Sequence, residues 1–410
     1  MKIAVIGSGI SGLSAAYFLS NKHKVDLFEQ NDHFGGHSFT FDIKEEEKVI
    51  PVDLGFIVFN ELTYKNLINF FDELNIPFEK SNMSFSVSIK DTNVEYGGSG
   101  FKAIFANKFN IFNFKFLKMI KEIISFYNYA PSLLNNNETN EETLGDYLKR
   151  SNLSKHFVEY HIIPMVAAIW SMPFSKAKEM PLNLFLKFFT NHGLFKLKNR
   201  PQWYTVTNRS RAYVNKILDK ISGEVFKNYK VNKISRSKDN VRILIGNEYL
   251  DYDQVILASH ADQSLNILDE ATKNEKEILS KFTYVSNIAF LHKDKNLMPV
   301  RKKAWSSWNS ITKNNNTCVT YWLNKLQNLN TKVDYFLTLN PVEDIDEKKI
   351  IKKMNFTHPY FNNENVKLQK NLNLLQGKQR TWFCGSYFGY GFHEDGLKSS
   401  IELIKNFINK

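Results

Sequence analysis

Glycines are concentrated at one point near the start of the chain, and their setting restricts the fold more than any other feature. Residues 3–6 form an apolar run with β-branched members, which suits a buried parallel strand. The run leads directly into Gly7-Ser8-Gly9-Ile10-Ser11-Gly12, and residues 13–20 then read as a helix with small residues on one face. A strand, a GxGxxG turn and a helix in this order predict the start of a parallel α/β domain.

Each glycine of the turn has its own physical role. Gly7 permits a tight turn, Gly9 lets the backbone approach a pyrophosphate, and Gly12 lets the helix pack closely on the strand. A second strand over residues 24–28 ends at Glu29, whose carboxylate can accept hydrogen bonds from the hydroxyls of an adenosine ribose. Because the free N–H groups at a helix start bind anions, the pattern predicts a dinucleotide site. We also assign to this site Ser8, Ser11 and Gln30.

A second glycine pair follows soon afterwards and distinguishes between dinucleotides. Gly35-Gly36-His37-Ser38 resembles the flavin amine oxidase superfamily, which includes phytoene desaturases and protoporphyrinogen oxidases. Members continue from the ribose-binding acid into a Gly-Gly turn along the phosphates and ribityl chain of the flavin. Residues 52–56 are similar to the next element of the superfamily and contain Gly55. The resemblance implies FAD as the cofactor, with contacts from Gly35, Gly36, His37 and Gly55.

The C-terminal end of the chain agrees with this resemblance. Residues 381–386 read as a strand entering a turn, and residues 390–396 precede an expected helix over 397–408. In the superfamily the turn contacts the ribityl chain, and the last helix points its N-terminus at the flavin pyrimidine ring, where the helix dipole stabilises negative charge. The resemblance therefore implies cofactor contacts from Gly385, Ser386, Gly396 and Leu397.

The chain also departs from the superfamily pattern. It has Gly385-Ser386 where many members have Gly-Asp or Gly-Glu, and Glu394-Asp395-Gly396 where many have Glu-Gly-Ala. Backbone N–H groups make most of the cofactor contacts, so FAD binding does not depend on these positions. The departures do weaken any transfer of amine oxidase chemistry to this chain.

Further motifs resemble a narrower group within the superfamily. These motifs are residues 53–60, 83–87, 168–171, 200–203 and 389–396. The group is an uncharacterised bacterial branch of FAD/NAD-binding oxidoreductase-like proteins, often associated with cyclopropane-fatty-acid-synthase-type methyltransferases. Related flavoproteins take part in desaturating methylated fatty acyl chains. The resemblance covers nearly the whole chain and implies a hydrophobic, lipid-like substrate.

The superfamily resemblance implies a discontinuous organisation. The expected fold class is α/β, with a Rossmann-type FAD-binding domain and a discontinuous α+β substrate domain, as in amine oxidases. The FAD-binding domain would take residues 1–75, 220–265 and 375–410, and the substrate domain residues 76–219 and 266–374. Within the middle return, residues 224–226 and 229–234 have a strand pattern, and residues 253–260 read as a buried strand. Val231 matches a position whose backbone often pairs with the adenine in relatives.

The basic and phenylalanine-rich composition suggests a surface partner. The chain holds 34 Phe in 410 residues and has a formal net charge of +12. Residues 101–126 combine both features, with seven Phe and five Lys against one acid, Glu122. We expect an amphipathic helix there, which either lies on an anionic membrane or packs as a core helix with a solvated lysine edge. Nucleic acid is not expected as a partner, because an FAD-binding fold already accounts for the chain.

Cysteine content and hydropathy bear on location. No run of about 18 apolar residues occurs, so no transmembrane helix is expected. Cys318 and Cys384 form neither a CxxC pair nor a zinc-ligand spacing, so we expect no metal site and no disulfide framework. The chain reads as cytoplasmic, with peripheral membrane attachment left open. Cys384, beside the glycine turn, is expected to be a buried structural thiol.

His393 is the candidate catalytic residue. A flavin takes hydride from a substrate C–H, and the protein supplies orientation, a proton acceptor and an apolar cavity. The motif places His393 at the flavin end of the last helix, where it either carries a proton or satisfies the loop backbone.

Several reactions are compatible with such a site. A desaturase or dehydrogenase of fatty acyl chains is favoured, and an amine oxidase and a flavin-dependent double-bond isomerase are the alternatives. The cage tyrosine of amine oxidases would fall near Phe392, which has no phenol. A flavin-binding protein without catalytic activity also stays open.

Overall fold

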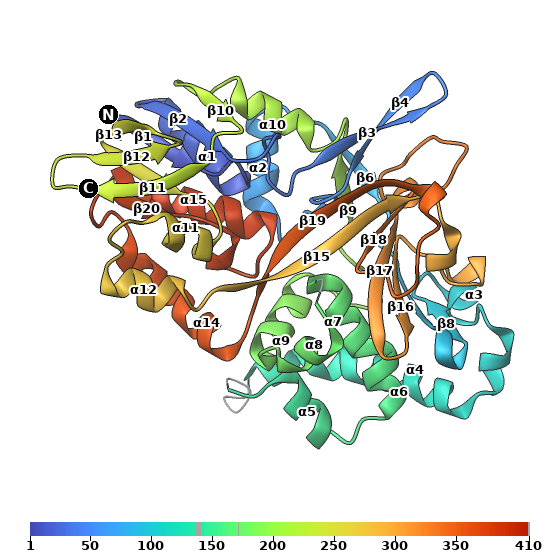
Figure 1. The fold of residues 1–410 in the computed structure, drawn as a ribbon. Helices are drawn as coiled ribbons and strands as arrows, with labels where there is room; N and C mark the ends of the chain where they lie inside the picture. The colour runs from blue at the N-terminus through green and yellow to red at the C-terminus, as the bar shows by residue number, and fades with distance from the viewer. Residues whose placement is uncertain (136–140, 171, 409–410) are drawn as a thin grey trace.

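The computed structural model describes residues 1–135, 141–170 and 172–408. Two large sheets organise these residues, and the chain passes between the sheets several times (Figure 1). Segments from the beginning, the middle and the end of the chain lie together around the first sheet. Residues that are far apart in the sequence therefore meet at one edge of that sheet.

The first sheet is parallel, with strand order β10-β2-β1-β14-β20. Its strands are β1 (Lys2–Ile6), β2 (Lys24–Glu29), β10 (Val225–Lys227), β14 (Gln254–Leu257) and β20 (Thr381–Phe383). Alternate side chains of β1 enter opposite layers: Ile3 and Val5 pack into one, and Ala4 and Ile6 into the other. All four side chains are buried, as a parallel sheet covered on both faces requires.

Helices cover one face of this sheet and a meander covers the other. The helices are α1 (Ile10–Ser20), α2 (Lys65–Glu73), α10 (Arg211–Leu218) and α15 (His393–Ile408). The opposite face carries β11 (Val231–Arg236), β12 (Val241–Ile245) and β13 (Glu248–Tyr252), with α11 (Ala261–Ile267) and α12 (Lys273–Leu279). Helices α1 and α15 pack side by side, which joins the two ends of the chain.

The second sheet has strand order β19-β15-β18-β17-β16-β7-β8, and only β7 and β16 pair in parallel. Its strands are β7 (Phe85–Ile89), β8 (Val94–Gly97), β15 (Thr283–His292), β16 (Trp308–Lys313), β17 (Asn316–Trp322), β18 (Phe336–Leu339) and β19 (Ile350–Tyr360). The long strands β15 and β19 pair along most of their length and run from this sheet toward the first one (Figure 1).

Helices pack against the second sheet and account for much of the phenylalanine content. They are α3 (Phe101–Ile104), α4 (Phe114–Tyr129), α5 (Leu144–Arg150), α6 (Lys155–Phe157), α7 (Ile163–Trp170), α8 (Phe174–Glu179) and α9 (Leu182–Asn191). Phe116, Phe157, Phe185 and Phe189 have no exposed surface and share one apolar cluster. Burial of large aromatic side chains supplies much of the stabilisation of such a helical layer.

Smaller elements connect the two parts. They are the hairpin β3 (Thr40–Glu45) and β4 (Lys48–Asp53), the strands β5 (Phe59–Asn60), β6 (Phe78–Ser81) and β9 (Trp203–Val206), and the helices α13 (Leu323–Leu326) and α14 (Asn363–Leu368). No helix within the described residues is long and apolar enough to cross a membrane.

The α/β fold class and the nucleotide-binding strands are confirmed. Strands β1, β2, β14 and β20 lie where the sequence predicts them. The domain boundaries stay a prediction, although α10, inside the predicted substrate range 76–219, packs into the core that holds α1. Ser171, the last residue of one motif, lies outside the described residues.

Two predicted helices differ from the structure. Residues 101–126 do not form one helix, because α3 and α4 are separated by a 3₁₀ turn at Lys108–Phe112. The Asn107 and Asn113 side chains accept backbone N–H groups at these interruptions, and asparagine favours such caps over a helix interior. The last helix begins at His393 rather than Leu397, so His393 and Asp395 lie in its first turn.

Candidate functional site

The turn after β1 is packed so closely that side chains are excluded. A Cβ on Gly12 would lie 1.8 Å from the Gly7 carbonyl oxygen. Gly7 has φ of +101° and donates its N–H to the Phe28 carbonyl of β2 at 2.8 Å. The turn therefore joins the carboxyl ends of β1 and β2 to the start of α1.

Gly9 differs from its neighbours because open space lies beside it. A Cβ on Gly9 would meet no atom within 4 Å, whereas a Cβ on Gly36 would lie 3.1 Å from the Gly9 Cα. The Gly35 N–H donates to the Ser8 carbonyl at 3.1 Å, which holds the second glycine pair against the first turn. A side-chain-free space at a helix N-terminus is what a pyrophosphate requires, so these residues fit a dinucleotide.

Glu29 is nearly buried at the end of β2. Its Oε2 accepts the Ser8 N–H at 3.0 Å and the Ser8 hydroxyl at 2.6 Å, and its Oε1 accepts two donors from Asn31. The Tyr229 N–H donates to the Glu29 carbonyl at 2.8 Å, which brings the chain before Val231 beside the predicted ribose site. Gln30 is exposed next to Glu29.

The C-terminal turn and α15 close the same region. A Cβ on Gly396 would lie 2.8 Å from the Ser11 hydroxyl oxygen and 3.9 Å from the Ser386 nitrogen. The Gly385 N–H donates to the Ser399 hydroxyl at 2.9 Å, which anchors the turn on α15. Leu397 is fully buried in the apolar core, so its side chain stabilises the helix position, and its predicted cofactor contact stays a prediction.

Asp395 fixes the start of α15. Its carboxylate accepts the Phe392 N–H at 3.0 Å. Burial raises the pKa of Asp395 to about 7, although backbone hydrogen bonds favour its charged form. The Gly396 N–H donates to the Phe392 carbonyl at 3.1 Å, and Gly396 packs against Ile10 and Ser11 at the N-terminus of α1.

His393 lies in a stacked and hydrogen-bonded position. Its ring stacks on Phe56 with centroids 3.7 Å apart and an interplanar angle of 8°. Its Nε2 lies 2.7 Å from the Tyr213 hydroxyl and 3.0 Å from the Ser38 hydroxyl, and these two hydroxyls also bond to each other. Burial lowers the pKa of His393 to about 3, so the imidazole is neutral near pH 7 and is a weak base.

Three more histidines gather beside the glycine pair. The His37 ring centroid lies 5.2 Å from that of His358 and 6.5 Å from that of His260. The His37 Nε2 is buried and has no hydrogen-bond partner among the described residues. A Cβ on Gly55 would lie 2.0 Å from the His37 carbonyl oxygen, so Gly55 lets the backbone hold His37 in place. Burial lowers the pKa of His37 and His260 to about 4 and that of His358 to about 3.

Aromatic side chains gather just before the start of α15. Phe392 stacks on Phe188 with centroids 4.8 Å apart and meets Trp170 edge-on at 6.2 Å. Tyr390 lies 5.9 Å from Phe188, so one phenol stands close to the position where amine oxidases place a cage tyrosine. The His192 ring also lies near Phe392, with centroids 6.1 Å apart, and stacks on Phe188.

Two cavities adjoin this region. One has a volume of about 410 Å³ and lies between α7 and the second sheet, with Ala168, Met172, Val285 and Leu339 among its apolar lining residues. Val285 pairs with His358 across β15 and β19, so this cavity borders the histidine group.

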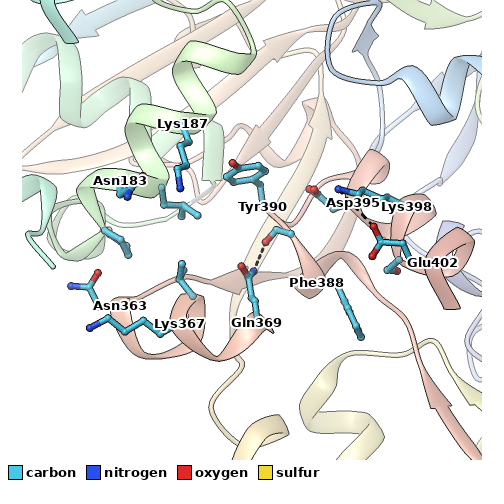
Figure 2. A pocket seen from close by; sticks show the side chains of 15 residues that line it. Asn183, Lys187, Asn363, Lys367, Gln369, Phe388, Tyr390, Asp395, Lys398 and Glu402 are labelled. Carbon is cyan, nitrogen blue, oxygen red and sulfur yellow. Dashed lines mark hydrogen bonds and ion pairs between the residues drawn. The ribbon is translucent and has the colours of Figure 1, made fainter. Parts of the chain in front are cut away.

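The other cavity, of about 350 Å³, lies beside α15 (Figure 2). Tyr390 and Asp395 lie on its α15 side, and Lys187, Asn363 and Lys367 lie opposite. Its charged and amide side chains do not suit an acyl chain.

The structure brings most of the predicted site residues together, but several neighbours were not predicted. Gly9, Ser11, Gly36 and Gly396 meet at the N-termini of α1 and α15. Sequence reasoning did not place Tyr213, Phe56 or His358 in the site, because each reaches it only through tertiary packing. Cys384 is buried and its thiol pKa is raised by burial, as expected of a structural thiol.

No group of metal-ligating side chains suited to hold an ion occurs in the described part of the chain.

Comparison with known proteins agrees with this architecture. Residues 5–74 match the family profile described as NAD(P)-binding Rossmann-like domain. No curated protein sequence matches the chain. A CLA-producing fatty acid isomerase from P. acnes has a similar structure, with a TM-score of 0.70 and 15% identity over 99% of this chain and 98% of the other.

Two amine oxidases are similarly close in structure. Cyclohexylamine oxidase from Brevibacterium oxydans IH-35A has a TM-score of 0.71 and 14% identity, and 99% of each chain is covered. Putrescine oxidase has a TM-score of 0.71 and 12% identity, and the whole of each chain is covered. The structural neighbours therefore belong to the flavin amine oxidase and desaturase superfamily, and the likeness concerns the fold.

Proposed function

We propose that this protein is an FAD-dependent oxidoreductase that acts on a hydrophobic, lipid-like substrate. The observation that carries the proposal is the side-chain-free space beside Gly9, which Gly36 borders and towards which α1 directs its N-terminus. Glu29 lies next to it at the end of β2. The choice of FAD over a nicotinamide dinucleotide rests on the second glycine pair and on the resemblance of the last helix.

The residues of the site divide into three roles. The turn Gly7–Gly12 and Gly36 would hold the phosphates. Glu29 would accept hydrogen bonds from the adenosine ribose hydroxyls, which would replace the present bond from the Ser8 hydroxyl. The N-terminus of α15 would orient the flavin end and stabilise negative charge there. When bound, FAD accepts a hydride from a substrate C–H.

The apolar surroundings favour an acyl substrate. Trp170, Phe188 and Phe392 form a ring cluster near the start of α15. Because burial of each CH₂ contributes about 0.8 kcal/mol, apolar walls select a long hydrocarbon chain. The likeness to a fatty acid isomerase supports this substrate class, and the narrower sequence resemblance supports acyl chains modified by methyltransferases of the cyclopropane-fatty-acid-synthase type. A cytoplasmic location fits two buried, free cysteines.

Two histidines are candidates for handling the proton. His393 is neutral near pH 7, so it can only accept a proton, and its low pKa makes it a weak acceptor. His37 has an unpartnered, buried Nε2, which leaves that atom free to bond a substrate or cofactor group. We retain His393 as the proton carrier and add His37 as its competitor.

Cofactor binding is tested by the spectrum of the purified protein. We expect a yellow protein with flavin absorbance bands, and acid precipitation should release the flavin because Cys384 packs as a structural thiol in the apolar cluster around α1 and α15. A protein that has no flavin bands and takes up no added FAD would contradict the proposal.

The reaction class is tested by anaerobic bleaching of the bound flavin. We expect bleaching by unsaturated or methyl-branched acyl lipids and none by a panel of amines. Bleaching by amines alone would assign an amine oxidase, with Tyr390 beside Phe392 as the amine-facing phenol. Product formation without bleaching would assign a double-bond isomerase. His393→Ala should retain FAD and slow the bleaching more than His37→Ala does. If His37→Ala slows the bleaching more, His37 is the proton carrier.

A further inference from the structure

The interrupted helical segment at residues 101–117 displays large apolar side chains to solvent. Phe101, Phe109, Phe112 and Phe114 expose 70%, 81%, 81% and 87% of their surface. We call these four residues the phenylalanine patch. Single exposed apolar residues are common, but four highly exposed phenylalanines within fourteen residues mark an interaction surface.

The scaffold under the phenylalanine patch is fixed. Phe116 and Met119 of α4 have no exposed surface and anchor that helix in the largest apolar cluster. The Asn113 side chain accepts the Lys115 and Phe116 N–H groups and so sets the start of α4. The exposed rings therefore project from a fixed frame, and their exposure follows from the way the segment folds.

Lysines surround the phenylalanine patch. Lys102, Lys108, Lys115 and Lys121 are exposed and form no ion pair with any described residue. Lys118 lies 3.9 Å from Glu122, the one acid of the segment, and Glu122 is itself engaged by Ser154. The segment therefore combines highly exposed aromatic rings with exposed, unpaired lysines.

We propose that the phenylalanine patch docks the protein on the headgroup layer of an anionic lipid bilayer. Aromatic rings insert at the boundary between headgroups and acyl chains, while lysines stay with the anionic headgroups. A second copy of this chain is a poorer occupant, because a symmetric contact would place unpaired lysines against their own copies. In Figure 1 the segment that carries α3 and α4 lies at the end of the molecule away from β1 and β2, so docking leaves the proposed nucleotide site clear.

The first experiment is co-sedimentation with phosphatidylcholine vesicles that contain or lack phosphatidylserine. We expect binding to the anionic vesicles, at least tenfold weaker binding to the neutral ones, and release by salt. Phe109→Ser with Phe112→Ser and Phe114→Ser should weaken binding at least tenfold, and Lys108→Gln with Lys115→Gln and Lys121→Gln should weaken it roughly fivefold per lysine.

Matched controls lie on the other part of the molecule. Val49→Ser removes a side chain that is 61% exposed on β4, and Lys22→Gln with Lys48→Gln and Lys405→Gln removes three exposed charges. Both control variants should bind anionic vesicles as the unchanged protein does. Equal loss in the controls and in the patch variants would overturn the proposal, as would equal binding to both kinds of vesicle.

A second experiment reports on the patch itself. Cys318 and Cys384 are both buried, so a thiol-reactive, polarity-sensitive dye will label Phe112→Cys selectively. Its emission should shift to the blue with anionic vesicles, whereas the same dye on Val49→Cys should not respond.

A blue shift that grows with protein concentration in the absence of lipid would assign the patch to self-association. A shift caused only by an added oligonucleotide would assign it to nucleic acid. Either result would overturn the lipid proposal. None of these measurements depends on FAD or on turnover, so they test the patch independently of the proposed function.

Discussion

The glycine turn after β1 and the phenylalanine patch relate side chains to function in opposite ways. In the turn, backbone atoms approach so closely that a Cβ on Gly12 would lie 1.8 Å from a carbonyl oxygen. In the patch, Phe114 keeps 87% of its surface exposed and contributes little to the folded core. The turn needs glycines because their lack of a side chain permits close backbone contact, whereas the patch displays large side chains that the folded core does not need. Substitutions in the two regions should therefore affect stability and binding differently.

A first expected difference lies within the turn itself. Gly12→Ala should cost about 3 kcal/mol or more of the free energy of unfolding, because its Cβ overlaps the Gly7 carbonyl and the backbone must move. Gly9→Ala places its Cβ in open space at an ordinary φ of −63°, so the free energy of unfolding should change by less than about 1 kcal/mol. Denaturant unfolding of the two variants checks both values.

Flavin retention then separates packing from binding. Gly9→Ala should fold yet bind added FAD at least about tenfold more weakly, since its methyl group enters the phosphate space. Full FAD retention by folded Gly9→Ala protein would mean that the space beside Gly9 is not the phosphate site.

The next difference lies within the phenylalanine-rich segment. Phe116→Ala should cost about 3–5 kcal/mol of the free energy of unfolding, because Phe116 is fully buried in the core under α4. Phe112→Ser, four residues earlier and 81% exposed, should change it by no more than about 0.5 kcal/mol. Urea unfolding of both variants measures the contrast, and similar losses would show that the exposed rings pack in solution.

Local rules made the nucleotide turn predictable. Each role assigned to Gly7, Gly12 and Glu29 depends on neighbours within about thirty residues, so the residue spacing predicts strand, turn and acid together. The start of α15 was predicted four residues late, because the contact that caps it joins Asp395 to the Phe392 N–H and has no separate sequence signature.

Tertiary contacts limit prediction elsewhere in the site. The Tyr213 hydroxyl reaches His393 across 180 positions of sequence, and His358 reaches His37 through the pairing of β15 with β19. For the phenylalanine-rich segment, composition predicts an amphipathic element but not which rings are buried, since that depends on where Asn107 and Asn113 interrupt the helix.

Buried histidines also occur in the second sheet and in the helices that pack against it. His161 lies between the hydroxyls of Tyr96 and Tyr127, at 2.9 and 2.8 Å, and His292 lies 2.7 Å from the Thr338 hydroxyl. Burial lowers the pKa of His161 to about 3 and the pKa of His292 to about 4, and it lowers that of His192 to about 4. Burial instead raises the pKa of two carboxyl groups, that of Asp53 to about 6 and that of Asp395 to about 7.

These shifts predict how acid affects stability. Between about pH 6.5 and pH 4, a histidine with a lowered pKa in the folded protein is protonated in the unfolded chain but not in the folded protein. Each such histidine therefore reduces the free energy of unfolding by about 1.4 kcal/mol for every pH unit of acidification in that window. Asp53 and Asp395 act in the opposite sense, because the folded protein keeps a proton that the unfolded chain loses above about pH 4. The histidines outnumber these two carboxyls, so we expect stability to fall steeply below about pH 6.5.

Single variants divide this acid response between the two kinds of buried group. In urea unfolding at a series of pH values, His161→Gln should flatten the loss by about 1.4 kcal/mol per pH unit, because glutamine takes up no proton on unfolding. Asp395→Asn should steepen the loss between about pH 7 and pH 4, because it removes a group that favours the folded state on acidification. The sign of the change thus identifies which kind of buried group was removed. An unchanged slope in His161→Gln would mean that burial does not keep His161 neutral in the folded protein.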